Sequence, residues 1–96
     1  MADSASQTVV FAIDGPIART DLPKLSDQVC ALLDRTGADV ALCDVTEIEA
    51  DAVSVDALAR VRLAARRRGC QTRLHGASSE LLDLLAFMGL RNVLND

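Results

Sequence analysis

Five acidic residues gather in one short stretch of the chain, and carboxylates this close together could bind a divalent cation. They are Asp44, Glu47, Glu49, Asp51 and Asp56. Ca²⁺ and Mg²⁺ prefer several carboxylate oxygens, but the spacing is not that of an EF-hand loop and no second acidic segment supports the cluster. A solvated loop with favourable negative charge at a helix N-terminus is the simpler interpretation. A surface for a protein partner is a third.

A run of arginines follows the acidic cluster and could bind phosphate groups. It consists of Arg60, Arg62, Arg66, Arg67 and Arg68. No aromatic residues alternate with these arginines, as they would on a platform for nucleic-acid bases. Cations in the last turn of a helix also complement its dipole, so a solvated helix end is the simpler interpretation. Asp56 and Arg60 have the spacing of an i,i+4 ion pair.

The residues that could act as nucleophiles or bases form no catalytic pattern. The three cysteines, Cys30, Cys43 and Cys70, lie in apolar segments at spacings that match no zinc motif, and we expect them to be reduced and largely buried. His75 has no acidic or thiol partner nearby in the sequence, and the five glycines never cluster into a phosphate-binding loop. We therefore expect no catalytic residues, no metal and no cofactor.

Composition and charge narrow the class of protein. The chain has 96 residues, half of them hydrophobic and a quarter charged, which is typical of one globular domain. Its net charge of −4 argues against nucleic acid as a partner. No apolar run is long enough to span a membrane and no secretory signal is present, so we expect a cytoplasmic protein. Residues 1–7 are expected to form a flexible N-terminus and residues 8–96 one domain.

Local patterns predict the alternating order β-α-β-α-β-α. Strands are expected at 8–14, 39–45 and 70–76, and the continuous apolar run of the second indicates a strand covered on both faces. The order favours an α/β fold, a small mostly parallel or mixed sheet with about three to four helices. One core is expected to bury Leu25, Val29, Leu42, Leu58, Val61, Leu82 and Leu85.

Capping residues predict where the three helices begin and end. The first is expected to start with Thr20 or Asp21 as its cap and to end at Gly37, because glycine readily adopts the left-handed conformation found there. The second is expected over 52–68 with Asp51 as its N-cap. The third should start at Ser78 or Ser79, place Met88 on its core face with the leucines and end at Gly89.

Three segments taken together resemble the STAS domain, the fold of anti-sigma-factor antagonists and of the cytoplasmic tails of sulfate transporters. They are FAIDGPIARTDLPKL, VALCDVTEIEADAV and VDALARVRLAARRRGCQTRLHGASSELLDLLAFMGL. The resemblance extends over about 8–94 and implies a STAS-like single domain. The family's first strand is expected to be incomplete, because only seven residues precede TVVFAID.

The resemblance also implies a site at the start of the second helix. The family motif there is Asp-Ser-Ser/Thr-Gly, whose second hydroxyl residue is phosphorylated by a partner kinase. In this chain Asp51 takes the place of the motif aspartate, Ala52 and Val53 the two hydroxyl positions, and Ser54 the glycine. The motif is therefore degraded, and Ser54 is the remaining phosphoacceptor candidate.

These observations lead to a functional expectation with one main alternative. We expect a non-catalytic regulatory module that docks on a protein partner, an ATP-binding anti-sigma kinase or a similar regulator. The surface expected to bind it comprises Glu47, Glu49, Asp51, Val53, Ser54 and Asp56. The alternative is a structural or oligomerisation domain without a phosphorylation switch. The sequence leaves open the oligomeric state and the binding of a small molecule, nucleotide or lipid.

Overall fold

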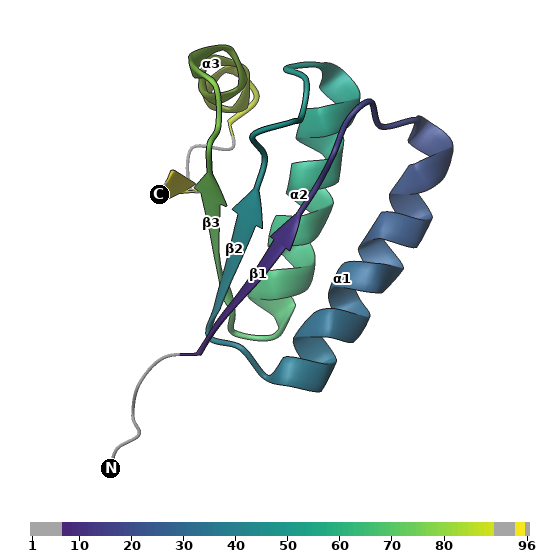
Figure 1. The fold of residues 1–96 in the computed structure, drawn as a ribbon, viewed down its shortest axis with the longest axis vertical. Coiled ribbons are helices and arrows are strands. Elements are labelled where there is room, and N and C mark those ends of the chain that lie inside the picture. Colours follow the sequence, from purple (N-terminus) through teal and green to yellow (C-terminus); the bar gives the residue numbers. More distant parts are fainter. Residues whose placement is uncertain (1–6, 90–93, 96) are drawn as a thin grey trace.

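The computed structural model describes residues 7–89 and the backbone of residues 94–95. Residues 1–6, which fall in the segment expected to be flexible, lie outside the described residues, as do residues 90–93 and 96. The strands are β1 (Thr8–Ala12), β2 (Val40–Asp44), β3 (Gln71–His75) and β4 (Leu94–Asn95). The helices are α1 (Leu22–Thr36), α2 (Ala52–Arg67) and α3 (Ser79–Phe87), and a 3-10 turn at Arg19–Asp21 precedes α1 (Figure 1).

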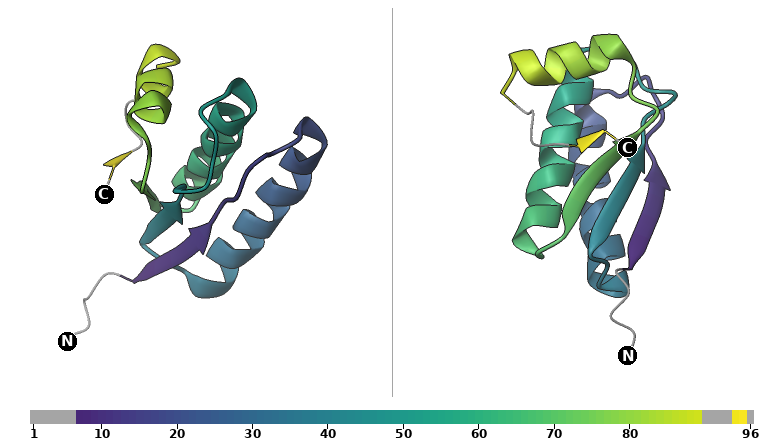
Figure 2. Two further views of the ribbon diagram at one scale, coloured as in Figure 1. Left: turned by 45° about the horizontal axis from the view of Figure 1, so that its top comes forward. Right: turned by 90° about the vertical axis from the view of Figure 1, so that its left-hand side faces the viewer.

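The four described strands form one parallel sheet in the order β1-β2-β3-β4, which is also their order in the chain. Helices α1 and α2 lie side by side on one face of this sheet, and α3 lies beyond the carboxyl ends of the strands (Figures 1 and 2). The predicted α/β class and the alternating order are confirmed. This arrangement brings the segments that follow β1, β2 and β3 to the same end of the molecule.

Helix termini follow the predicted capping residues with one exception. The amide of Gly37, at φ +61°, donates to the carbonyl of Leu33 and ends α1, and Ser78 caps α3 by accepting from the amide of Leu81. Asp21 stands at the N-cap position of α1, but its carboxylate accepts from the amide of Ala18 instead. The cause is the 3-10 turn before α1, which the sequence pattern did not predict.

The sheet has one covered face and one open face. Ala41, Cys43 and Leu74 point into the core and are fully buried, because α1 and α2 both pack on that side. On the other face Leu42 is only half-buried and Val10 is 62% exposed. The expectation that β2 is covered on both faces is therefore wrong for the described part of the chain.

The predicted core is confirmed in its central part. Val29, Leu58, Val61 and Leu85 are buried in one cluster. Two further predicted core residues, Leu25 and Leu82, are only half-buried. Met88 is 54% exposed at the end of α3, so its expected place in the core is wrong. None of the described helices is long and apolar enough to cross a membrane.

The cysteines are free thiols, as expected; Cys43 and Cys70 are buried and Cys30 is half-buried. Burial, with a smaller contribution from the negative charge of Asp44, raises the pKa of Cys43 to about 12.

The cysteines should differ in reactivity, because only the thiolate reacts with disulfide reagents. In the native protein at pH 8 we expect Cys30 to react first with such a reagent and Cys43 to react only after unfolding. Peptide mass mapping of labelled protein would decide, and rapid native labelling of Cys43 would contradict the burial.

Candidate functional site

The loop between β2 and α2 lies between the segments that follow β1 and β3. On one side the amide of Gly15 donates to the carbonyl of Glu47 at 3.2 Å. A Cβ on Gly15 would lie 3.4–3.5 Å from the backbone of residues 47–49. On the other side Gly76, at φ +77°, lies so close to Thr46 that a Cβ there would collide with the threonine side chain. The two glycines thus hold the loop at a fixed position at the carboxyl end of the sheet.

A turn at the end of β2 sets the direction of this loop. One carboxylate oxygen of Asp44 accepts from the amide of Thr46 at 3.0 Å and from its hydroxyl at 2.6 Å. These two bonds, with a smaller contribution from the charge of His75, hold the pKa of Asp44 below its usual value. Ile48 then turns back into the core, where it is 8% exposed. The side chain of Ile48 therefore attaches the loop to the core, while Glu47 and Glu49 on either side of it remain exposed.

Asp51 begins α2, as the sequence predicts. Its backbone is extended, and its carboxylate accepts from the amide of Ser54 at 2.8 Å. This satisfies one of the amides that a helix N-terminus leaves without a partner. Hydrogen bonds from the amide and then the hydroxyl of Ser54 hold the pKa of Asp51 below its usual value.

We expect Asp51 to make stability depend on pH. Because its pKa is lowered by folding, its contribution is present above the unfolded value of about 3.9 and is lost as the pH falls through the folded pKa. Removal of the cap in Asp51→Ala should lower the free energy of unfolding by about 1 kcal/mol at pH 7, and by less at pH 3. Urea unfolding at both values tests this. Asp51→Asn, which keeps an acceptor oxygen, is the matched control and should lose less at pH 7.

The other predicted site residues divide into exposed and buried groups. Val53 is half-buried, whereas Ser54 is buried at 2% exposure. Asp56 lies on the next turn of α2, between Arg19 at 3.4 Å and Arg60 at 3.3 Å, and the latter is the predicted i,i+4 pair. These three charged side chains lie at the molecular surface, whereas the side chain of Ser54 is buried beneath it.

The described residues do not assemble a metal site. No group of three or more His, Cys, Asp or Glu side chains among them is arranged to hold a metal ion. The structure does bring together one pair that the sequence pattern did not, because Asp44 and His75 are register partners on adjacent strands. The sequence did carry a signal for this proximity, because both residues lie near the end of a predicted strand. The carboxylate of Asp44 is already bonded to Thr46, and the nearby thiol of Cys43 is buried.

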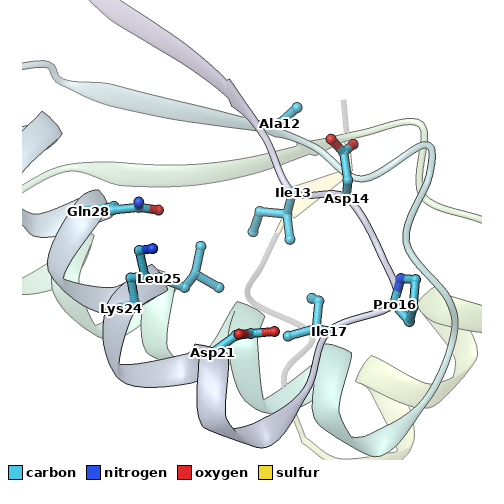
Figure 3. Close-up of a pocket in the computed structure, with 9 residues that line it drawn as sticks. All are labelled: Ala12, Ile13, Asp14, Pro16, Ile17, Asp21, Lys24, Leu25 and Gln28. Carbon is cyan, nitrogen blue, oxygen red and sulfur yellow. The ribbon is translucent and has the colours of Figure 1, made fainter.

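A pocket of about 320 Å³ between the end of β1 and α1 is a further feature that the sequence did not indicate. Ile13, Ile17 and Leu25 point toward one another within it, while the carboxylate of Asp14 points away from them (Figure 3). The volume is at the lower end of the usual range for small-molecule sites. The carboxylate of Asp21 at its edge accepts a hydrogen bond from the amide of Ala18.

Several solved structures share the fold of this chain. RsbS of Moorella thermoacetica, as a serine-to-glutamate variant, has a TM-score of 0.76 at 17% identity, over 96% of this chain and 80% of its own. The unphosphorylated anti-sigma factor antagonist SpoIIAA has a TM-score of 0.72 at 13% identity, over 97% and 83%. A sulfate transporter family protein from Wolinella succinogenes has a TM-score of 0.64 at 22% identity, over 86% and 67%.

The sequence of this chain matches a family model but no individual curated protein. None of the curated proteins is similar enough to match the chain. The family model described as "Mlab, STAS domain" matches residues 1–95, and the structural likenesses agree with it in fold. This 96-residue chain therefore belongs to the STAS domain family.

Proposed function

We propose that this protein is a non-catalytic regulatory module that docks on a protein partner through the loop and helix start at 47–58. The partner class we propose is an ATP-binding anti-sigma kinase or a similar regulator in the cytoplasm. The observation that carries the proposal is the loop held between Gly15 and Gly76, which presents Glu47 and Glu49 on a fixed backbone. A rigid, exposed, charged loop favours specific recognition, because little conformational entropy is lost on binding.

The burial of Ser54 supports docking without a phosphorylation cycle. Its side chain is 2% exposed and its hydroxyl interacts with Asp51. Val53, in the usual acceptor position, has no hydroxyl. A phosphate on Ser54 would also lie beside the carboxylate of Asp51, which repels it. We therefore propose that the module binds its partner constitutively.

Incubation with a panel of purified anti-sigma kinases and ATP tests both parts of the proposal. We expect a complex in a pull-down and no gain of phosphate mass on the protein. Glu47→Arg and Glu49→Arg should each weaken binding by about tenfold, since each reverses a charge on the proposed interface. Asp27→Arg, an equal charge change at an exposed position of α1, is the matched control and should leave binding unchanged.

Two results would contradict the proposal. A mass gain that disappears in Ser54→Ala would show a working phosphorylation switch. Binding that is insensitive to Glu47→Arg and Glu49→Arg would place the interface elsewhere.

The open face of the sheet favours a second candidate, a structural or oligomerisation domain. Val10 is 62% exposed there, next to the half-buried Leu42, its register partner. Exposed apolar surface of this kind often marks an interface. If this is its role, light scattering should show a concentration-dependent oligomer that Val10→Lys dissociates. A monomer at all concentrations would exclude this candidate.

A further inference from the structure

Helices α1 and α2 form a groove of about 730 Å³ that adjoins the proposed docking surface at 47–58 and shares Asp56 with it. Its lining residues come from α1, from α2 and from Arg68 directly after α2. Asp56 lies at one end of the groove and Arg68 at the other. From Asp56 to Arg68 there are twelve residue steps of about 1.5 Å each, so the groove is about 18 Å long, the length of about three helical turns.

The middle of the groove is apolar and shallow. Leu63, a large hydrophobic residue of a type that is usually buried, is 49% exposed there. Around it the lining side chains are small, and they include Cys30, Ala59 and Ala64. Small side chains allow the backbone of another helix to come close, while Leu63 offers apolar area for it to bury.

The rim of the groove is positively charged in a chain whose net charge is −4. Arg60 is paired with Asp56 at 3.3 Å, and Arg68 with Asp34 at 2.7 Å. Arg67 forms no ion pair with any residue that the structure describes. The groove therefore retains a guanidinium group without a counter-charge next to an exposed leucine.

We propose that this groove binds an acidic amphipathic helix of a protein partner. The apolar stripe of that helix would cover Leu63, and its carboxylates would pair with Arg67 and interact favourably with Arg60. Helices commonly dock in this way, with apolar anchors at i, i+3, i+4 and i+7. The short contact length makes the complex a weak and transient one, which suits a second, modulating contact next to the main docking surface.

The shape and charge of the groove favour a helix over an anionic membrane. A membrane-binding surface projects several large apolar side chains into the lipid and surrounds them with basic residues. Here the surface is concave, Leu63 is the one large apolar side chain that lines it, and the net charge of the chain is negative.

NMR titration of the ¹⁵N-labelled full chain with synthetic peptides tests the proposal. The probe is a helical peptide about 16 residues long, with leucines at i, i+3, i+4 and i+7 and glutamates beside them; the matched control peptide has lysine in place of each glutamate. We expect the acidic peptide to shift the amides of Ala59, Leu63 and Arg67 saturably, and the basic peptide to leave them unshifted.

Substitutions on either side of the groove separate specific docking from general attraction. Leu63→Glu and Arg67→Glu should each raise the Kd by about tenfold. Arg66→Glu makes the same charge change at an exposed neighbouring position that does not line the groove, and it should change the Kd less than about threefold. Glu47→Arg, in the proposed kinase-binding loop and outside the groove lining, should leave peptide binding intact, so the two proposals can fail separately.

Several outcomes would overturn the inference. Saturable shifts could be absent up to about 1 mM acidic peptide, or the lysine peptide could bind equally well. Arg66→Glu could weaken binding as much as Arg67→Glu. Vesicles of phosphatidylglycerol and phosphatidylcholine could broaden the groove amides while the acidic peptide leaves them unchanged, which would assign the groove to a membrane instead.

Discussion

Gly76→Ala is expected to lower the free energy of unfolding by about 2–5 kcal/mol. Two effects add. Gly76 has φ +77°, where a side chain is strained, and an added Cβ would collide with the side chain of Thr46. Because Thr46 directly precedes the proposed docking loop, we also expect the amide signals of residues 46–51 to shift in NMR spectra. Urea unfolding measures the first effect and NMR the second.

Gly37→Ala is the matched control for the contribution of backbone strain. Gly37 also has a positive φ, of +61°, but a Cβ added there would have no neighbour within 4 Å. It should therefore lose only the strain contribution of about 1–2 kcal/mol. In a Thr46→Gly background, which removes the side-chain atoms but keeps the Cα at 3.3 Å, the effect of Gly76→Ala should fall toward that value. An equal loss for Gly76→Ala in both backgrounds would show that the contact with Thr46 does not matter.

Leu58→Ala is expected to lower the free energy of unfolding by about 2–5 kcal/mol. Leu58 lies on α2 and is fully buried in the core cluster. The substitution removes buried apolar surface and leaves a cavity that close-packed neighbours fill only in part. Chemical denaturation with an unchanged m-value would give the difference directly.

Leu42→Ala is the matched control for Leu58→Ala, since it removes the same atoms from the open face of the sheet. Leu42 is half-buried, so it should lose about 1 kcal/mol. Equal losses for the two variants would mean that the open face is covered in solution, and would support an interface there.

Sequence reasoning succeeded where the signal is local. Gly37 ends α1, Asp51 begins α2 and Ser78 begins α3 because each interaction joins residues three or four positions apart. The prediction that Leu42 is buried was wrong, because an apolar run predicts a buried strand but does not indicate which face of the sheet the helices cover. Both α1 and α2 pack on the same side, and this is a property of the whole chain.

The candidate site shows the same division between local and long-range information. The cap at Asp51 follows from its own helix, whereas the contact of Thr46 with Gly76 joins residues from two different strand ends. The positions of Asp44 and His75 near the ends of predicted strands indicated that they could be close, but their register as direct partners depends on which strands become neighbours. The degraded motif at Ala52 and Val53 was visible in the sequence, but the burial of Ser54 was not.

The order of the strands has a consequence for synthesis on the ribosome. Each strand pairs with the one made just before it, from β1 through to β4, so no described strand inserts between two older ones. Chains emerge N-terminus first and can begin to fold as they do so. Once β2 has left the exit tunnel, its partner β1 and the connecting helix α1 are already outside. The nascent sheet can thus grow one strand at a time at a single edge, without separating any pair that has already formed.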